Sequence, residues 1–249
     1  MNTRALFKLL TALLLMASAG QLPAEEIRVA VASNFTNAMK ELVRRFELNS
    51  GHKVKLIFGS TGKHYAMIKN GAPFDAFFAA DVKRPKLLEQ EKIAQPGSRF
   101  TYAVGKIVLW SPKPNYVDAG GRVLEQKQFR YIAAANPKLA PYGKAAKEVL
   151  QARGLWQGLR SQMVRGENIG QTYQFVKSGN AELGFVAASQ VKRPGYTIKG
   201  SMWEVPQSLY TPIEQQAVLL RGSSAAQAFM TYVKSSESRQ VISGFGYGR

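Results

Sequence analysis

The sequence contains no cysteine, and only two of its 249 residues are histidine. Without cysteine there is no disulfide and no thiolate, which is compatible with an oxidising compartment. His52 and His64 stand outside any metal-ligand spacing. The chain also lacks a Gly-x-x-x-x-Gly-Lys-Ser/Thr phosphate loop and a Gly-x-Ser-x-Gly nucleophile elbow. We therefore expect no enzyme activity and no cofactor.

Acidic residues are scarce: the chain has 16 of them against 34 lysines and arginines, a formal charge of +18. A basic surface attracts nucleic acid, anionic membranes or small anions. The basic residues are scattered, with no dense run and no interleaved aromatic residues. Nucleic acid is therefore not an expected partner, whereas attraction of a small anion and plain solubility both remain open.

Long apolar runs are absent after the first 24 residues. Residues 1–24 have the pattern of a signal peptide: Arg4 and Lys8 are followed by an apolar run, Leu9 to Ala19, that is too short to span a membrane. We expect cleavage after Ala24, with Ala19 as the alternative. The predicted product is exported to the periplasm, and without cysteine it has no lipid anchor.

The mature chain alternates strand-like and helix-like segments, which predicts an α/β fold. In the first part the expected strands are 27–32, 54–58 and 76–80, with helices after 33–34, over 63–70 and after Asp81. In the second part we expect strands at 131–134, near Met163 and at 184–188, with helices at 144–153 and 169–177. Gly51, Gly71 and Gly179 are expected helix stops. Helices at 225–232 and 238–242 close the chain.

Two extended runs are long enough to pass from one domain into another: Phe100 to Trp110, which is broken at Gly105, and Pro212 to Leu220. We therefore predict two α/β lobes joined by crossings near 101–106 and 210–216. Lobe I would comprise residues 25–104 and 213–249, and lobe II residues 105–212.

Four polar or small turns each precede an expected helix: Ser33-Asn34, Gly59-Ser60-Thr61-Gly62, Ala140-Pro141-Tyr142-Gly143 and Glu167-Asn168-Ile169-Gly170. Each turn alone is most simply a helix cap, with Ser60 or Thr61 as the N-cap of its helix. Two of the turns fall in each predicted lobe. Since ligands of open α/β sheets bind beyond the carboxyl ends of the strands, the four turns predict an anion site between the lobes.

The residue types at these turns limit the guest. They offer hydroxyls, an amide and backbone N–H groups, and Glu167 is the only acidic residue among them. A fully ionised tetrahedral dianion needs donors only, whereas hydrogen phosphate also needs an acceptor. The turns therefore favour a molybdate-like or sulfate-like ion. Lys63 and His64 follow the second turn and are expected on the helix surface.

The turns and their neighbours resemble those of the periplasmic molybdate-binding proteins of bacterial molybdate ABC transporters, over essentially all of 27–249. The stretches that carry the resemblance are Val31-Ala32-Ser33-Asn34, Gly59-Ser60-Thr61-Gly62, Asn70-Gly71-Ala72-Pro73, Phe78-Ala79-Ala80-Asp81, Asn136-Pro137 with Ala140-Pro141-Tyr142-Gly143, Gly184-Phe185-Val186-Ala187 and Pro212-Ile213. The Ala-Pro-Tyr-Gly stretch resembles the branch of the family whose binding tyrosine lies there, so no role passes to Ala187.

The resemblance implies a type II periplasmic-binding-protein fold that closes on molybdate or tungstate by a hinge, and delivery to an ABC permease. It implies that the oxyanion is bound by Ser33, Asn34, Thr61, the Tyr142 hydroxyl and the Ile169 N–H. Thr61 stands where the family usually has serine. Ser60, Gly62 and Asn168 are further candidates; molybdenum enters only as bound molybdate.

The implied protein is a monomer without catalysis. A binding protein for sulfate or an organic anion remains an alternative. An enzyme and a ferric-ion binder are less well supported, since the latter would need a second tyrosine beside Tyr142.

Overall fold

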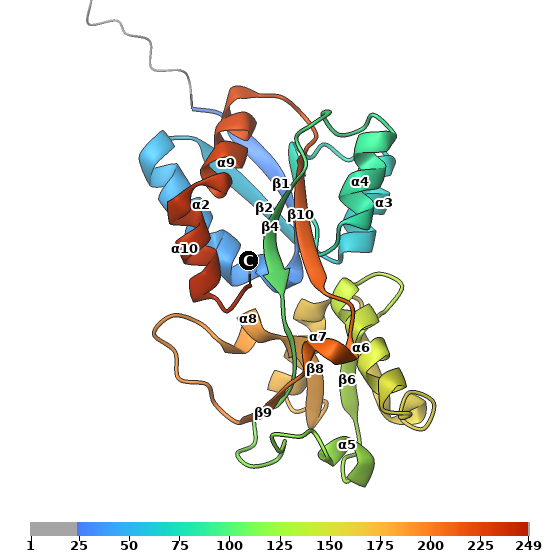
Figure 1. Cartoon of the computed structure of the whole chain (residues 1–249). Helices are drawn as coiled ribbons and strands as arrows, with labels where there is room; N and C mark the ends of the chain where they lie inside the picture. Colours follow the sequence, from blue (N-terminus) through green and yellow to red (C-terminus); the bar gives the residue numbers. More distant parts are fainter. Residues whose placement is uncertain (1–23, 249) are drawn as a thin grey trace, which may run out of the picture.

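Two α/β lobes, each containing a five-stranded sheet, form the protein (Figure 1). The structure is a computed structural model that describes residues 24–248. The expected leader, residues 1–24, lies outside the described residues except for Ala24. Within residues 24–248, no helix combines the length and the apolar character needed to cross a bilayer.

Lobe I contains the sheet with strand order β2-β1-β3-β10-β4. Its strands are β1 (Glu26–Ala32), β2 (Lys53–Gly59), β3 (Ala76–Phe78), β4 (Phe100–Gly105) and β10 (Ile213–Leu219). β1 pairs in parallel with β2 and β3, and β10 pairs antiparallel with β3 and β4. The helical segments are η1 (Ser33–Phe35), α2 (Thr36–Ser50), α3 (Thr61–Lys69), α4 (Lys83–Gln90), α9 (Ser224–Lys234) and α10 (Ser236–Gly244). In Figure 1, α2, α9 and α10 lie on one side of the sheet and α3 and α4 on the other.

Lobe II contains the sheet with strand order β7-β6-β8-β5-β9. Its strands are β5 (Ile107–Ser111), β6 (Ile132–Ala135), β7 (Met163–Gly166), β8 (Leu183–Ala187) and β9 (Ser201–Glu204). β6 pairs in parallel with β7 and β8, and β5 pairs antiparallel with β8 and β9. The helical segments are α5 (Val123–Gln126), α6 (Pro141–Ala152), η2 (Arg160–Gln162), α7 (Ile169–Lys177), α8 (Ala188–Val191) and η3 (Gln207–Leu209).

Two segments connect the lobes, and Figure 1 shows them running side by side through the junction. The expected long strand from Phe100 to Trp110 consists of two strands, because β4 ends at Gly105 and β5 begins at Ile107 in the other sheet. The chain returns from β9 to β10 through residues 205–212. The first crossing thus falls at the end of the expected 101–106 segment, whereas the return begins at residue 205 and shares only residues 210–212 with the expected 210–216 segment.

Apolar residues cover both faces of each sheet, as the continuous apolar runs predict for mostly parallel strands. Two hydrophobic clusters pack against the sheet of lobe I and two against the sheet of lobe II. The larger lobe II cluster also contains Ala32, Ala80 and Ile213 of lobe I. The two lobes therefore share an apolar contact directly beside the carboxyl ends of β1 and β3.

Glycine ends three of the expected helices through the left-handed conformation that it adopts without strain. Gly51, at φ 73°, follows α2; Gly71, at φ 82°, follows α3; and Gly179, at φ 80°, follows α7. The expected boundary of the helix at 144–153 is wrong at its start, because α6 begins at Pro141. Proline at the first helical position needs no N–H partner there, so the helix can begin directly at the turn. This shift places Tyr142 in the first turn of α6.

Candidate functional site

The four polar turns meet at a small cavity between the lobes, with a volume of about 10 Å³. Drug-sized sites are commonly about 300–1,000 Å³, so the size of this cavity is compatible only with a guest of a few heavy atoms. No residue in the lining carries a charge; it consists of Ala32, Ser33, Asn34, Gly59, Ser60, Thr61, Ala80, Ala140, Pro141, Tyr142, Asn168 and Ile169. Of the eight predicted site residues, the structure brings seven to this cavity, and Gly62 alone lies outside its lining.

The turn between β2 and α3 brings Ser60 and Thr61 to the cavity. Ser60 is the N-cap of α3, and its hydroxyl accepts a hydrogen bond from the Lys63 N–H at 3.3 Å. Thr61 is 1% exposed, and its hydroxyl accepts a hydrogen bond from the Ala80 N–H at 3.0 Å. Among the described residues, no acceptor is found for the Thr61 N–H, which is one of the unpaired donors at the start of a helix.

Gly62 contributes to the contact between the lobes instead. Its N–H donates to the Leu139 carbonyl at 2.9 Å. A Cβ on Gly62 would lie 3.0 Å from that carbonyl oxygen and 3.1 Å from the Arg84 guanidinium. The second glycine of the Gly-Ser-Thr-Gly turn is therefore required by close packing rather than by the cavity itself.

The turn after β1 contributes Ser33 and Asn34. The Ser33 hydroxyl accepts a hydrogen bond from the Gly170 N–H of the other lobe at 3.1 Å. The Asn34 side-chain amide is already bonded within the protein, since it donates to Gln215 Oε1 at 2.7 Å and to the Tyr247 hydroxyl at 3.1 Å. Any contact of Asn34 with a guest therefore depends on its backbone N–H.

Lobe II contributes Tyr142 from the first turn of α6. Its side chain is 1% exposed, and its hydroxyl accepts a hydrogen bond from Gln215 Nε2 at 3.3 Å. Burial raises the pKa of Tyr142 well above its usual value. The hydroxyl therefore keeps its proton at physiological pH and can serve as a donor.

The turn before α7 contributes Asn168 and Ile169. Asn168 is the N-cap of α7, and its side chain accepts from the Gln171 N–H at 2.9 Å. Among the described residues, no acceptor is found for the Ile169 N–H. The starts of α3, α6 and α7 thus all contribute to the cavity lining, and each brings a partial positive charge.

The three buried hydroxyls share one arrangement. Those of Ser33, Thr61 and Tyr142 each accept a hydrogen bond from a protein donor. Within residues 24–248 none of them donates to a protein acceptor, so their hydrogens remain available to a guest. A cavity that offers hydrogens and helix N-termini, but no side-chain cation, suits an anion that has only acceptors.

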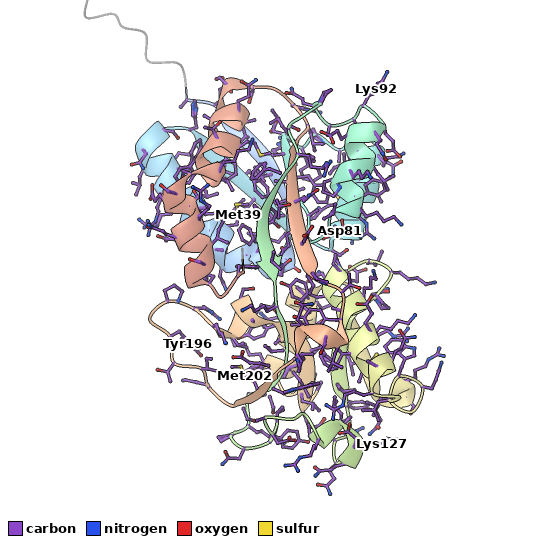
Figure 2. The ribbon with its side chains drawn as sticks, viewed as in Figure 1. Met39, Asp81, Lys92, Lys127, Tyr196 and Met202 are labelled. Carbon is purple, nitrogen blue, oxygen red and sulfur yellow. The ribbon has the colours of Figure 1, made fainter. Side chains whose placement is uncertain are left out.

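Charged residues stand at the rim of the junction. Lys63 Nζ lies 3.4 Å from Glu167 Oε2 of the other lobe, and both side chains are exposed. Asp81, which Figure 2 places at the junction, pairs with Arg84, whose guanidinium also donates to the Lys138 carbonyl of lobe II at 3.1 Å. These contacts hold the lobes together without placing a net charge in the cavity.

The expected position of His64 on the surface of its helix is wrong. The side chain is 2% exposed, with its Nε2 3.2 Å from the Val31 carbonyl and its ring edge-on to Phe74 and Phe77. Burial lowers its pKa to about 4, so the ring is neutral at physiological pH. His64 fills the space beneath Gly59, where an added Cβ would lie 2.9 Å from its ring nitrogen.

Two residues of the site were missed in the sequence. Ala80 lines the cavity and donates its N–H to Thr61. Gln215 contacts Asn34 and Tyr142 from β10. The only signal for Ala80 was its position at the end of an expected strand. The only signal for Gln215 was the pair of adjacent glutamines, Gln215 and Gln216, in an otherwise apolar run.

Comparisons with known proteins show the family to which the chain belongs. The model of the family described as bacterial extracellular solute-binding protein matches residues 27–248. The chain is 52% identical to the molybdate-binding protein ModA of Azotobacter vinelandii over 237 residues, which is 94% of this chain and 93% of that protein. It is 46% identical to the ModA of Rhodobacter capsulatus over 238 residues, 94% of this chain and 92% of that protein.

Solved structures show the same fold. The periplasmic molybdate-binding protein of Azotobacter vinelandii superposes with a TM-score of 0.87 at 41% identity, covering 90% of this chain and 99% of that chain. The sulfate-binding protein SubI of Mycobacterium tuberculosis has a TM-score of 0.67 at 14% identity, covering 90% of this chain and 86% of that chain. At 14% identity the second likeness concerns the fold alone.

Proposed function

Because the chain belongs to the bacterial extracellular solute-binding protein family, we propose that it binds molybdate between its lobes and delivers it to an ABC importer. The relatives that are 52% and 46% identical over most of the chain carry the name molybdate-binding protein. Tungstate belongs to the same proposal, because it is also a fully ionised tetrahedral dianion. The protein acts as a carrier in this proposal and performs no catalysis.

The single observation that carries the proposal is the uncharged cavity lined with donors. A dianion in such a site is stabilised by hydrogen bonds and helix N-termini, as at other anion sites of proteins. Hydrogen phosphate would need an acceptor for its proton, and the three buried hydroxyls are oriented as donors by their protein partners. The cavity therefore favours fully deprotonated oxyanions over phosphate.

Each predicted site residue has a place in the proposal. The hydroxyls of Ser33, Thr61 and Tyr142 donate to the oxyanion, together with the backbone N–H groups of Asn34 and Ile169. Ser60 and Asn168 shape the cavity as N-caps of α3 and α7, and their hydrogen bonds to Lys63 and Gln171 keep the helix starts in position. Gly62 lets the two lobes approach closely.

The proposal also covers export, the division into two lobes and the hinge between them. Residues 1–24 are removed on export, and the mature monomer works in the periplasm. We retain the division into lobe I, residues 25–104 and 213–249, and lobe II, residues 105–212; the separate sheets of the two halves support it. The two crossings between these sheets act as the hinge.

Thermal unfolding of the mature protein with different oxyanions tests the proposal. A ligand that binds only the folded protein at a thousandfold excess over its Kd stabilises it by about 4 kcal/mol. For a chain of this size that raises Tm by about 8–16 °C. We expect this shift with molybdate and tungstate, a smaller one with sulfate and none with phosphate, each compared with sodium chloride at equal ionic strength.

The outcomes separate the alternatives. Equal shifts with sulfate and molybdate would make the protein a general binder of ionised oxyanions. Absence of any shift, with native mass spectrometry also showing no bound oxyanion, would refute the proposed function. Hydrolysis of a generic phosphoester by the purified protein would contradict the absence of catalysis.

A further inference from the structure

Gln215 lies fully buried in the junction, on the strand through which the chain returns to lobe I. It is 0% exposed and belongs to β10, where the pairing with β4 shifts register between Gln215 and Gln216. It does not line the cavity. Its side chain nevertheless contacts residues that stand beside the cavity in both lobes.

The three hydrogen bonds of Gln215 define the orientation of its amide. Oε1 accepts from Asn34 Nδ2 at 2.7 Å and lies 3.1 Å from the Tyr102 hydroxyl. Nε2 donates to the Tyr142 hydroxyl at 3.3 Å. The Tyr102 hydroxyl also lies 3.0 Å from the Ala79 carbonyl, so the Asn34 amide is the group that fixes Oε1 as the acceptor. The N–H side of the Gln215 amide is therefore directed to Tyr142.

The neighbouring Asn34 amide is oriented by a second set of contacts. Its Nδ2 also donates to the Tyr247 hydroxyl at 3.1 Å. The Tyr247 hydroxyl lies 2.8 Å from the Asn34 carbonyl and 2.9 Å from the Ser189 hydroxyl, so its single hydrogen has an acceptor there and its oxygen accepts from Asn34 Nδ2. Asn34 therefore presents its NH₂ group to Gln215, which in turn presents its carbonyl oxygen to Asn34.

The hinge leaves space for the bond between Gln215 and Tyr142. Gly105, the last residue of β4, lies against both side chains. A Cβ on Gly105 would overlap the Tyr142 hydroxyl and would lie 2.7 Å from Gln215 Nε2. Glycine at this crossing therefore permits the tyrosine of lobe II to reach the strand of lobe I.

We propose that Gln215 is a positioning residue that makes the Tyr142 hydroxyl donate into the cavity and thereby selects anions without a proton. The inference rests on the proposed oxyanion-binding function. A hydroxyl has one hydrogen, and when its oxygen accepts from Gln215 that hydrogen is free for the guest. A guest that presents an O–H group at this position meets another O–H group and loses a hydrogen bond.

Replacement of Gln215 by glutamate reverses the direction of the hydrogen bond between residue 215 and the Tyr142 hydroxyl. At pH 8 the introduced carboxylate accepts the Tyr142 hydrogen, so the oxyanion loses that donor. We expect Gln215→Glu to weaken molybdate binding at least a hundredfold at pH 8. A buried carboxyl has a raised pKa. When it is protonated at pH 5.5, it can donate to Tyr142 as the amide does, and affinity should recover to within about tenfold of the wild type. Each affinity is taken relative to the wild type at the same pH, which cancels protonation of the anion.

The negative charge alone would also weaken anion binding, so the decisive measurement is a double-mutant cycle with Tyr142→Phe. Without the hydroxyl, Gln215→Glu acts only through its charge. We expect its effect at pH 8 to be at least tenfold smaller in the Tyr142→Phe background. If calorimetric titration showed that Gln215→Glu weakens molybdate binding by the same factor with and without the Tyr142 hydroxyl, the proposal would be overturned.

Gln216→Glu is the matched control. It makes the same chemical change one residue away, where the side chain bonds to Arg99 at 2.8 Å and Thr101 at 3.0 Å. We expect a change in molybdate affinity of less than threefold and no coupling to Tyr142→Phe. Coupling as strong as that of Gln215→Glu would overturn the proposal by showing that any charge in β10 acts on Tyr142.

If Gln215→Glu does not fold, Gln215→Met provides the same cycle without a charge. It removes the donor to Tyr142, and we expect about a tenfold loss of affinity that shrinks below threefold in the Tyr142→Phe background. Additive effects would overturn the proposal while leaving molybdate binding by the wild type intact. Failure of the wild type to bind any tetrahedral oxyanion would instead overturn the proposed function, and this inference with it.

Discussion

Replacement of Thr61 by valine isolates the contribution of one buried hydroxyl at nearly constant shape. Thr61 is 1% exposed, and its hydroxyl accepts from the Ala80 N–H at 3.0 Å. Valine leaves that N–H without an acceptor in a buried position, which costs about 1–3 kcal/mol. The protein without ligand should therefore melt about 2–12 °C lower.

The same substitution removes the hydroxyl that we propose as a donor to the oxyanion. A hydrogen bond to a charged group contributes about 1.5–3 kcal/mol, so Thr61→Val should weaken molybdate binding by roughly ten- to a hundredfold. Thr61→Ser is the matched control, because it keeps the hydroxyl and loses only a methyl group. We expect it to retain affinity within about threefold of the wild type.

Calorimetric titration of both variants, together with their melting curves, decides the role of Thr61. Wild-type affinity in Thr61→Val, accompanied by the loss of stability, would mean that the hydroxyl only supports the Ala80 N–H. That result would refute the reasoning by which the hydroxyl hydrogens of the cavity are assigned to the guest.

Three further predictions concern pH, hinge motion and export. Since the pKa of His64 falls from 6.5 to about 4 on folding, the unfolded chain binds more protons between these values, and the free energy of unfolding should drop by about 2 kcal/mol from pH 7 to pH 5. His64→Gln should remove this loss of stability, whereas His52→Gln should keep it. If denaturation curves gave the two variants the same pH dependence of the free energy of unfolding, the loss could not be assigned to His64. Small-angle scattering should show a smaller radius of gyration with molybdate than without it, and an identical profile at saturation would count against closure at the hinge. N-terminal sequencing of the exported protein should begin at Glu25, and detection of residues 1–10 would show that the leader is retained.

The order of elements could be predicted because local signals determine it. The alternating run of β1 and the glycines at 51 and 179 depend only on neighbouring residues. Likewise, the two halves of the run from Phe100 to Trp110 could be separated at Gly105. At Gly51 and Gly179 the chain needs a left-handed φ, which glycine supplies by itself.

Features that depend on tertiary contacts could not be predicted. His64 has the sequence context of a helix surface, yet it fills the space beneath Gly59 and beside Phe77. The Asn34 amide was expected at the cavity and instead bonds to Gln215 and Tyr247, which are 181 and 213 residues away in the sequence. No local pattern in the sequence indicates that the Asn34 amide will contact side chains so distant along the chain.

From the geometry of the junction we expect binding and closure of the lobes to be coupled. Two backbone N–H groups bridge the lobes beside the cavity, from Gly62 to the Leu139 carbonyl and from Gly170 to the Ser33 hydroxyl. Such bonds each contribute about 0.5–1.5 kcal/mol, and the exposed pair of Lys63 and Glu167 adds at most about 1 kcal/mol.

Closure also buries the hydroxyls of Ser33, Thr61 and Tyr142, whose hydrogens find no protein acceptor within residues 24–248. A buried donor without an acceptor costs about 1–3 kcal/mol, so these three groups offset the gains of the bridging bonds. An oxyanion supplies acceptors to all three groups at once, and it can do so only when the Tyr142 side of the cavity meets the Thr61 side. The difference in affinity between the closed and the open arrangement is what shifts the hinge. Removing one of these hydroxyls should therefore weaken binding and reduce the shift toward closure that the oxyanion produces.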